Sequence, residues 1–498
     1  MNPGNKQLDQ KLIEAISANS DEKLTADSLV ESILDSGVVL FHDQYEVAYM
    51  SPDGTGREIV RISSKKGRLW IQRYAYTVHK QVIGSDILKR VSQILEGQAI
   101  LASDEHKLHV RVFSNDEGLL YDLGKSAVLI NPSGWEIIDK PPIVFKRFSH
   151  HKPQVNPIKN GDVKLLFKYI NIADKESQLL LLVYVISAFI PNFPHPLLIL
   201  YGPQGAGKTT PMMVMKSLID PSAMITGSSA PTKYEELIQI LSHHAFIFFD
   251  NLSKMPEWFS DALSKAATGD SFSKRELYSD DDDIIYNIQL PIALNGINQV
   301  VYKSDLLDRS ILIELERITR KKRKQYRVFW SEFERDKPAI LGGIFDVLSK
   351  AMKSYPNVKL PESDRMADIN HWGYAISEAA GFKGEDFIKA YSKNIDNQHE
   401  EAINASPVAQ TILELMADRD EWHGTPAELY KVLQAIANND LELGSSKAWP
   451  ADSARLSKSL SIILPNLQAK GIYLDRKRSK ERLITITKTT VDTDATDA

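Results

Sequence analysis

The chain has 498 residues, 43% of them hydrophobic, and its 60 Lys and Arg against 65 Asp and Glu give a formal charge of −5 at pH 7. At about 150 residues per domain this length predicts three to four domains, and so much apolar material excludes wholesale disorder. Cysteine is absent, which excludes disulfide scaffolds, thiolate zinc sites, iron–sulfur clusters and cysteine nucleophiles.

Targeting and membrane segments are not predicted. Residues 1–19 are polar and mixed in charge, without the apolar stretch of a secretory leader. The most apolar run, residues 179–190, is shorter than the about 20 residues that cross a bilayer, so we expect a buried helix there. Together with the lack of cysteine, this pattern favours a cytoplasmic protein.

The N-terminal third predicts helices followed by an α+β domain. Amphipathic helices are expected in residues 1–37, and residues 38–148 then change to short alternating patterns. The predicted elements are strands at 58–62, 69–74, 107–113 and 118–123 and a helix at 85–96. The polar, proline-containing residues 149–161 predict a linker.

The middle of the chain, residues 162–316, alternates helices with apolar strands, which is typical of a parallel sheet with helices on both faces. The predicted strands are 197–201, 245–249, 290–294 and 310–315. Residues 317–396 are expected to form a helical subdomain.

The C-terminal part, residues 397–488, predicts three helices and a hairpin, the plan of a winged-helix domain. Its second helix opens at Thr425 and Pro426, and its third is expected to end at Pro465. A disordered tail is expected at 489–498. The whole is thus a multidomain α/β chain.

A phosphate-binding loop follows the first strand of the middle part. Residues 202–209 read Gly-Pro-Gln-Gly-Ala-Gly-Lys-Thr, the complete G-x4-G-K-[ST] pattern. Its glycines let backbone N–H groups converge on a phosphate, and the helix beyond adds positive potential. Lys208 is expected on the β- and γ-phosphates of ATP and Thr209 on Mg²⁺. The nucleotide-binding residues are predicted to be Gly202, Pro203, Gln204, Gly205, Ala206, Gly207, Lys208, Thr209 and Thr210.

Asp250 ends the apolar run 246–250, where a second acidic group is needed to hold Mg²⁺ through water. Thr209 and Asp250 are therefore the predicted magnesium ligands. For the loop the alternative is a chance Gly-rich turn, and for Asp250 it is an ordinary strand terminator.

The segments 250–253, 260–269, 275–278, 291–296 and 305–310 form an ordered series of motifs. In this order they resemble the ATPase core of superfamily-three helicases. They are more closely similar to the poxvirus-type primase–helicase ATPases of phages, plasmids and integrative elements. The resemblance extends over residues 38–395 and implies an AAA+-like, homo-oligomeric and hexameric ring with ATP at its subunit interfaces.

The resemblance also implies roles for two further residues. Asn295 matches a sensor that orients the attacking water, and Arg309 matches an arginine finger for the ATP of a neighbouring subunit. Lys208, Asp250, Asn295 and Arg309 are thus the expected catalytic residues. The alternatives are a turn residue for Asn295 and a surface salt bridge to Asp305 or Asp308 for Arg309.

The chain departs from this family at two places. Asn251 stands where many AAA+ ATPases have a catalytic glutamate, so the general base is left open among Asp250, Glu257, Asp261 and Asp270. The hairpin before the sensor strand has aspartates at 280–283 where viral helicases have basic residues that contact DNA. Contact there must come from the neighbouring Lys274 and Arg275 or from other loops.

The C-terminal segment gives an independent sign of DNA binding. Residues 450–488 contain nine basic and three acidic residues within a chain that is acidic overall. The residues expected on the phosphate backbone or near a groove are Arg455, Lys458, Arg476, Lys477, Arg478 and Lys480. The alternative is a protein–protein module.

Two other groups of residues are not predicted to form functional sites. The basic run 320–324 is interpreted as a solvated helix face. The pairs at 150–151 and 243–244 are histidines that lie too far from other ligand types to predict a metal site.

These patterns together predict an ATP- and Mg²⁺-dependent DNA helicase or translocase of a mobile genetic element, active in replication. A separate primase or polymerase is a further expected partner. The alternatives are a replication initiator, loader or DNA-remodelling ATPase without unwinding, and a DNA-binding regulator in which the nucleotide is an assembly switch.

Overall fold

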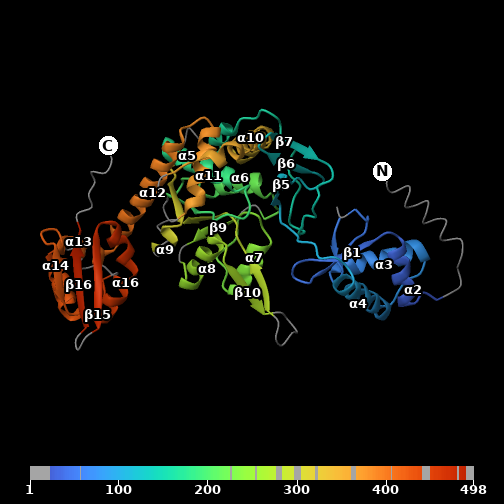
Figure 1. The fold of residues 1–498 in the computed structure, drawn as a ribbon, viewed down its shortest axis with the longest axis horizontal. Coiled ribbons are helices and arrows are strands. Elements are labelled where there is room, and N and C mark those ends of the chain that lie inside the picture. Colours follow the sequence, from blue (N-terminus) through green and yellow to red (C-terminus); the bar gives the residue numbers. More distant parts are fainter. Residues whose placement is uncertain are drawn as a thin grey trace.

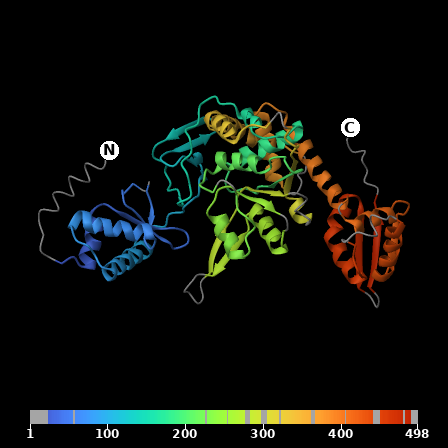
Figure 2. The same ribbon diagram turned by 180° about the vertical axis from the view of Figure 1, so that it is seen from behind.

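The computed structural model describes residues 23–55, 58–224, 227–252, 255–275, 283–296, 304–319, 323–360, 366–404, 406–439, 449–478 and 482–489. A small N-terminal unit, a large central unit and a small C-terminal unit follow one another along the longest axis (Figures 1 and 2). The chain is therefore a multidomain α/β protein, as expected. Among the described residues, no helix has both the length and the apolar character needed to cross a membrane.

The N-terminal unit packs three helices against a three-stranded antiparallel sheet. Its elements are α2 (Ala26–Asp35), β1 (Val39–His42), β2 (Ala48–Ser51), β3 (Val60–Arg61), α3 (Lys65–His79) and α4 (Ser85–Leu101). The strand predicted at 69–74 is wrong, because these residues lie inside α3. Gly67, Ile71 and Ala75 are buried at intervals of one turn, a period that a six-residue window is too short to reveal.

A four-stranded antiparallel sheet follows, formed by β4 (Val112–Asn115), β5 (Gly118–Asp122), β6 (Ala127–Asn131) and β7 (Gly134–Ile138). It shares a hydrophobic core with the central helices, including α10 (Tyr326–Ser354). The indole nitrogen of Trp135 donates to Asp346 in that helix at 2.7 Å. The buried apolar residues of 38–148 are therefore divided between the core of the N-terminal unit, the core of the central unit and two small clusters. The strand predicted to begin at 107 begins at Val112 instead, because Arg111 has a left-handed φ of 64°.

The central sheet is parallel, with the order β13-β8-β12-β9. The strands are β8 (Leu197–Tyr201), β9 (Ile247–Leu252), β12 (Ile292–Gly296) and β13 (Ser310–Glu314), close to the predicted ranges. Alternate side chains of β8 enter two different cores, Leu198 with α5 (Lys175–Ser187) and α6 (Thr209–Ile219), and Ile199 with α7 (Tyr234–Ser242) and α8 (Glu257–Thr268). Helices thus cover both faces, as predicted.

The segment at 149–161, predicted to be a linker, is packed onto the central unit. Gln154 is buried, and its side-chain nitrogen donates to the carbonyl oxygen of Leu218 at 2.8 Å. The amide of Ile158 donates to the carbonyl oxygen of Pro338 in α10 at 3.0 Å. A Cβ on Gly342 would lie 1.6 Å from the oxygen of Ile158, so this close crossing requires glycine. The buried Gln154 of this polar segment is therefore hydrogen-bonded inside the protein.

The helices α11 (Ala367–Ala379) and α12 (Gly384–Asn404) confirm the helical character expected after the sheet. Helix α12 continues past residue 396, where the sequence indicated a domain boundary, and leads into the C-terminal unit (Figure 1). That unit contains α13 (Pro407–Leu415), β14 (Glu421–Gly424), α14 (Pro426–Asn439), α16 (Ser453–Ala469), β15 (Ile472–Arg478) and β16 (Arg482–Lys488). Its antiparallel sheet has the order β14-β16-β15.

Two details of the C-terminal unit were not predicted. Strand β14 pairs with β16, but it is too short to give a periodic signal in the sequence. Helix α16 continues through Pro465, which was expected to end it. Beyond the proline, Leu467 is fully buried and His399 Nδ1 lies 3.0 Å from Asn466 Oδ1. These contacts hold the last turn despite the cost of about 3 kcal/mol for an interior proline.

Candidate functional site

The phosphate-binding loop connects β8 to α6 at the carboxyl edge of the parallel sheet, as the sequence predicted. Gly202, Gly205 and Gly207 have φ values of 143°, 84° and 71°, and a Cβ on Gly202 would lie 2.4 Å from the oxygen of Leu315. The ammonium of Lys208 donates to the carbonyl oxygen of Gly202 at 2.6 Å. It is therefore held over the loop, and the glycines are required by the backbone geometry.

The two predicted magnesium ligands are brought together. Thr209 Oγ1 donates to the Asp250 carboxylate, at 3.1 Å from Oδ1 and 3.2 Å from Oδ2. Thr209 begins α6 and Asp250 lies in β9, so the parallel strands create the contact by ending at the same edge of the sheet. A hydroxyl and a carboxylate are oxygen ligands that suit Mg²⁺.

Asn295 lies within β12, between the strand that carries the loop and the strand that carries Asp250. Its Oδ1 accepts a hydrogen bond from the Asn251 amide at 2.7 Å. Its Nδ2 is buried and has no hydrogen-bond partner among the described residues. The position inside a strand rules out the alternative of a turn residue. A buried, unsatisfied donor costs about 1–3 kcal/mol, so a group that accepts from Nδ2 is expected here.

Arg309 lies on the other edge of the sheet. It directly precedes β13, whose Ser310 pairs with Leu197 at the start of β8 and whose Glu314 pairs with Tyr201 at its end. Its Nη1 donates to the carbonyl oxygen of Ser264 in α8 at 3.4 Å. A strand of this length spans about 16 Å. Arg309 is thus separated from the phosphate-binding loop of its own chain by the length of the sheet.

Two arginines that the sequence analysis did not select lie beside the loop. The chain leaving β13 runs along it, since the Ile318 amide donates to the oxygen of Gly205 at 3.2 Å. A Cβ built on Gly205 would lie 3.8 Å from Arg317 Nε and 3.5 Å from Arg323 Nη2. Both side chains are exposed. The run 320–324 was interpreted as a solvated helix face; Arg323 and Lys324 are exposed but precede α10, and residues 320–322 lie outside the described residues. No local signal in the sequence marks these arginines, because their place beside the loop depends on the pairing of β13 with β8.

Of the carboxylates considered as general base, Asp250 lies in β9, Glu257 and Asp261 lie in α8, and Asp270 follows α8. The helix ends near the amino edge of the sheet, because the amide of His195, just before β8, donates to the oxygen of Ala267 at 3.0 Å. Asp270 follows that end and lies 4.0 Å from Lys265 Nζ. Glu257 is the first residue of α8 and follows β9 from the carboxyl edge. Of the candidates outside the strand, Glu257 is therefore placed best.

The predicted DNA-binding residues of the central unit lie on a hairpin formed by β10 (Ser271–Arg275) and β11 (Asp283–Asn287), which projects from that unit (Figure 1). Lys274 pairs with Ile284 and Arg275 with Asp283 in the strand register. The side chains of these two basic residues and the aspartates at 280–282 lie outside the described residues.

In the C-terminal unit, three predicted basic residues lie close together. Arg476 in β15 donates through Nη2 to the oxygen of Ser457 at 3.1 Å, next to the exposed Lys458. Arg455, one turn earlier in α16, is 73% exposed and 4.0 Å from Asp452. Lys477 and Arg478 continue β15, but their side chains lie outside the description, as does all of Lys480.

Comparison with known proteins identifies the class to which the chain belongs. A family described as "Actinomycete integrative conjugative element replication protein" matches residues 163–401, and one described as "AICE RepA C-terminal domain" matches residues 408–496. Together the matches extend over about two thirds of the chain. It is a replication protein of an integrative conjugative element. The family to which it belongs is AICE RepA.

Solved structures show a distant likeness. "The A form apo structure of NrS-1 C terminal region-CTR" is 12% identical with a TM-score of 0.40. "The apo structure of NrS-1 C terminal region (305-718)" is 11% identical, also with a TM-score of 0.40. Each match covers 94% of this chain and 100% of the other. No curated protein matches the chain.

Proposed function

We propose that the protein is an ATP-driven DNA helicase or translocase that serves the replication of its element. The observation that carries this proposal is the contact of Thr209 with Asp250 beside a complete phosphate-binding loop. Lys208 and the loop amides would bind the phosphates, and Mg²⁺ would supply charge neutralisation between the β- and γ-phosphates. Asn295, through its unsatisfied Nδ2, would hold the attacking water.

The position of Arg309 supports a ring of identical subunits. The Arg309 guanidinium, at the amino edge of the sheet, is remote from the nucleotide site of its own chain. In a ring it would contact the nucleotide bound by a neighbouring subunit. There it would offset the charge that develops on the γ-phosphate. Arg317 and Arg323 would serve the nucleotide of their own chain. Six AAA+-like subunits are the arrangement that the sequence resemblance implies.

The C-terminal unit supports a role on DNA. Among its described residues, the order of helix, strand, two helices and two strands agrees with the winged-helix plan expected from the sequence, and the exposed Arg455, Lys458 and Arg476 gather on one side of α16. Phosphate neutralisation by such residues is the main source of affinity for duplex DNA. We propose that this unit positions the duplex while the central ring moves along one strand. A primase or polymerase encoded separately remains the proposed partner.

A second candidate is an initiator or loader that hydrolyses ATP without separating strands. The aspartates at 280–283 of the sequence favour it, because carboxylates repel the phosphates that a pore loop must contact. Asn251, which lacks a carboxylate, similarly favours a nucleotide-switched regulator with slow turnover.

One experiment separates these functions. ATP hydrolysis and displacement of a labelled strand from forked DNA are measured on the same preparation of the full chain. We expect DNA-stimulated hydrolysis together with displacement. DNA-stimulated hydrolysis without strand displacement would favour the initiator or loader instead. Tight ATP binding with very slow turnover would favour the regulator.

The basic residues of the C-terminal unit give a separate prediction. In the triple variant Arg455→Gln, Lys458→Gln, Arg476→Gln we expect weaker duplex binding and a shallower dependence on salt. Each lost phosphate contact lowers the slope of log K against log salt by about 0.9. Fluorescence anisotropy at several salt concentrations measures the slope.

The matched control for that triple variant is Lys470→Gln, in the same unit, because Lys470 is ion-paired with Glu400. An unchanged slope in the triple variant would assign this unit to protein–protein contact instead.

A further inference from the structure

Four histidines from two distant segments of the chain lie close together near the start of β9. His150 and His151 lie in the packed segment after β7, and His243 and His244 lie between α7 and β9. The His150 oxygen accepts from the Ala223 amide at 2.7 Å, and His151 Nε2 lies 2.9 Å from the His243 oxygen. In the sequence the two histidine pairs are too isolated from other ligand types to predict a metal site. The tertiary structure corrects this point by joining them.

We propose that His150, His151 and His244 form a binding site for a divalent transition metal ion of the zinc type. One ring nitrogen from each lies within 4.8 Å of the other two. The ring centroid of His150 lies 4.6 Å from that of His151 and 4.6 Å from that of His244. The centroids of His151 and His244 are 6.2 Å apart. Tetrahedral zinc with Zn–N bonds of about 2.0–2.1 Å places ligand nitrogens about 3.4 Å apart. Small side-chain rotations therefore suffice.

The hydrogen bonds around the rings support ligation. His150 Nε2 is buried and has no hydrogen-bond partner in the described part of the chain. His151 donates through Nε2 to the His243 oxygen at 2.9 Å, and its Nδ1 accepts a hydrogen bond from the Phe148 amide at 3.3 Å, which ligation through Nδ1 would replace. His244 Nδ1 lies 3.4 Å from Asp220 Oδ2. Ligating histidines usually direct the other ring N–H to such a carbonyl or carboxylate.

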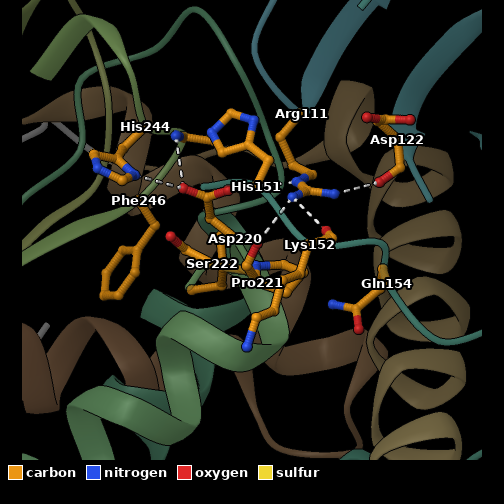
Figure 3. A network of polar contacts seen from close by, with 12 residues as sticks. Arg111, Asp122, His151, Lys152, Gln154, Asp220, Pro221, Ser222, His244 and Phe246 are labelled. Carbon is orange, nitrogen blue, oxygen red and sulfur yellow. Dashed lines mark hydrogen bonds and ion pairs between the residues drawn. The ribbon is translucent and has the colours of Figure 1, made fainter. Parts of the chain in front are cut away.

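The charges around the site determine how it would work. Figure 3 shows Asp220 between His244 and Arg111, and Lys216 Nζ lies 2.7 Å from its carboxylate. Burial opposes ionisation of Asp220, but Lys216, the hydrogen bond from His244 and Arg111 outweigh it and keep its pKa well below the usual range. Lys216 Nζ is also 3.0 Å from His244 Nδ1. In that contact Nδ1 accepts from the ammonium, so ligation through Nε2 would require the other tautomer, in which Nδ1–H donates to Asp220 Oδ2 at 3.4 Å in place of the bond from Lys216.

The imidazoles are already in the form that binds metal. Burial lowers the pKa of His150 and His244, and it lowers the pKa of His151 to about 4. Neutral imidazole is the ligand form, so no proton has to be displaced at neutral pH.

The site is separate from the proposed magnesium site. Asp220 caps the end of α6, and Thr209 is the first residue of this helix. Eleven residues of helix span about 16 Å. An ion bound here would fasten the segment that follows β7 to the turn between α7 and β9, and so hold the antiparallel sheet against the core. The proposal concerns structure and does not depend on ATP hydrolysis.

The test uses the full chain after chelator treatment, without nucleotide or DNA and with millimolar Mg²⁺. We expect one Zn²⁺ per chain by calorimetry and elemental analysis. Co²⁺ should give the visible absorption of a low-symmetry, tetrahedral-type site. His150→Ala should weaken binding at least 10-fold. His244→Asn, which keeps a donor toward Asp220 but removes Nε2, should do the same.

His423→Ala, an exposed histidine of β14, is the control and should bind as the wild type does. Circular dichroism checks that each variant is folded. A wild-type chain that binds no Zn²⁺, or site variants that bind it equally well, would overturn the proposal.

Discussion

Replacing Lys208 by alanine is expected to reduce ATP hydrolysis at least about 100-fold and to abolish strand displacement. The ammonium is held over the loop by the oxygen of Gly202, in the position from which it can reach the β- and γ-phosphates. Removing it deletes a charge-assisted contact that strengthens as charge develops on the transferred phosphate. Turnover is measured at saturating ATP so that weaker binding does not mimic slower chemistry.

The control for this variant is Lys233→Ala, an exposed lysine of the same unit that lies before α7. It should hydrolyse ATP at the wild-type rate. Duplex binding by Lys208→Ala should also be unchanged, because the basic residues of the C-terminal unit are remote from the loop. Hydrolysis by Lys208→Ala at the wild-type rate would remove the basis for any ATP-driven function.

The second large effect is expected at Arg309. Arg309→Ala should lower turnover by about 10³-fold or more, the scale seen where an arginine finger acts from a neighbouring molecule. The decisive measurement mixes this variant with Lys208→Ala. In randomly mixed rings about a quarter of the interfaces combine an intact loop with an intact finger, so activity should partly return. Two inactive chains that complement each other would demonstrate shared sites.

Arg317→Ala is the matched control for complementation. Arg317 lies beside Gly205 of its own chain, so this defect and that of Lys208→Ala fall on the same side of every interface. Mixing these two variants should therefore restore nothing. Recovery in this mixture, or none with Arg309→Ala, would mean that the arginines have the opposite roles. If the chain stays monomeric in the presence of ATP, neither arginine can act on the nucleotide of a neighbouring subunit.

In the central unit, the phosphate-binding loop could be predicted from the sequence but the arginine beside it could not. The loop, its strand and its helix were predictable because each signal is local, with glycines, a lysine and a threonine at fixed spacing between apolar runs. Arg317 could not be chosen from the sequence. Its place beside Gly205 follows from the pairing of β13 with β8, strands that are more than a hundred residues apart.

The amino-acid sequence by itself determined the parallel core, the loop and the basic C-terminal segment, because hydrophobic period and motif spacing act within a few turns of chain. The helix at 65–79 shows where this fails, since a short apolar window fits two periods equally well. Only the tertiary structure placed Thr209 in contact with Asp250 and His150 close to His244. It also placed Arg309 at the amino edge of the parallel sheet, opposite the phosphate-binding loop. These relations depend on strand order and on side chains brought together from distant segments, which no local pattern encodes.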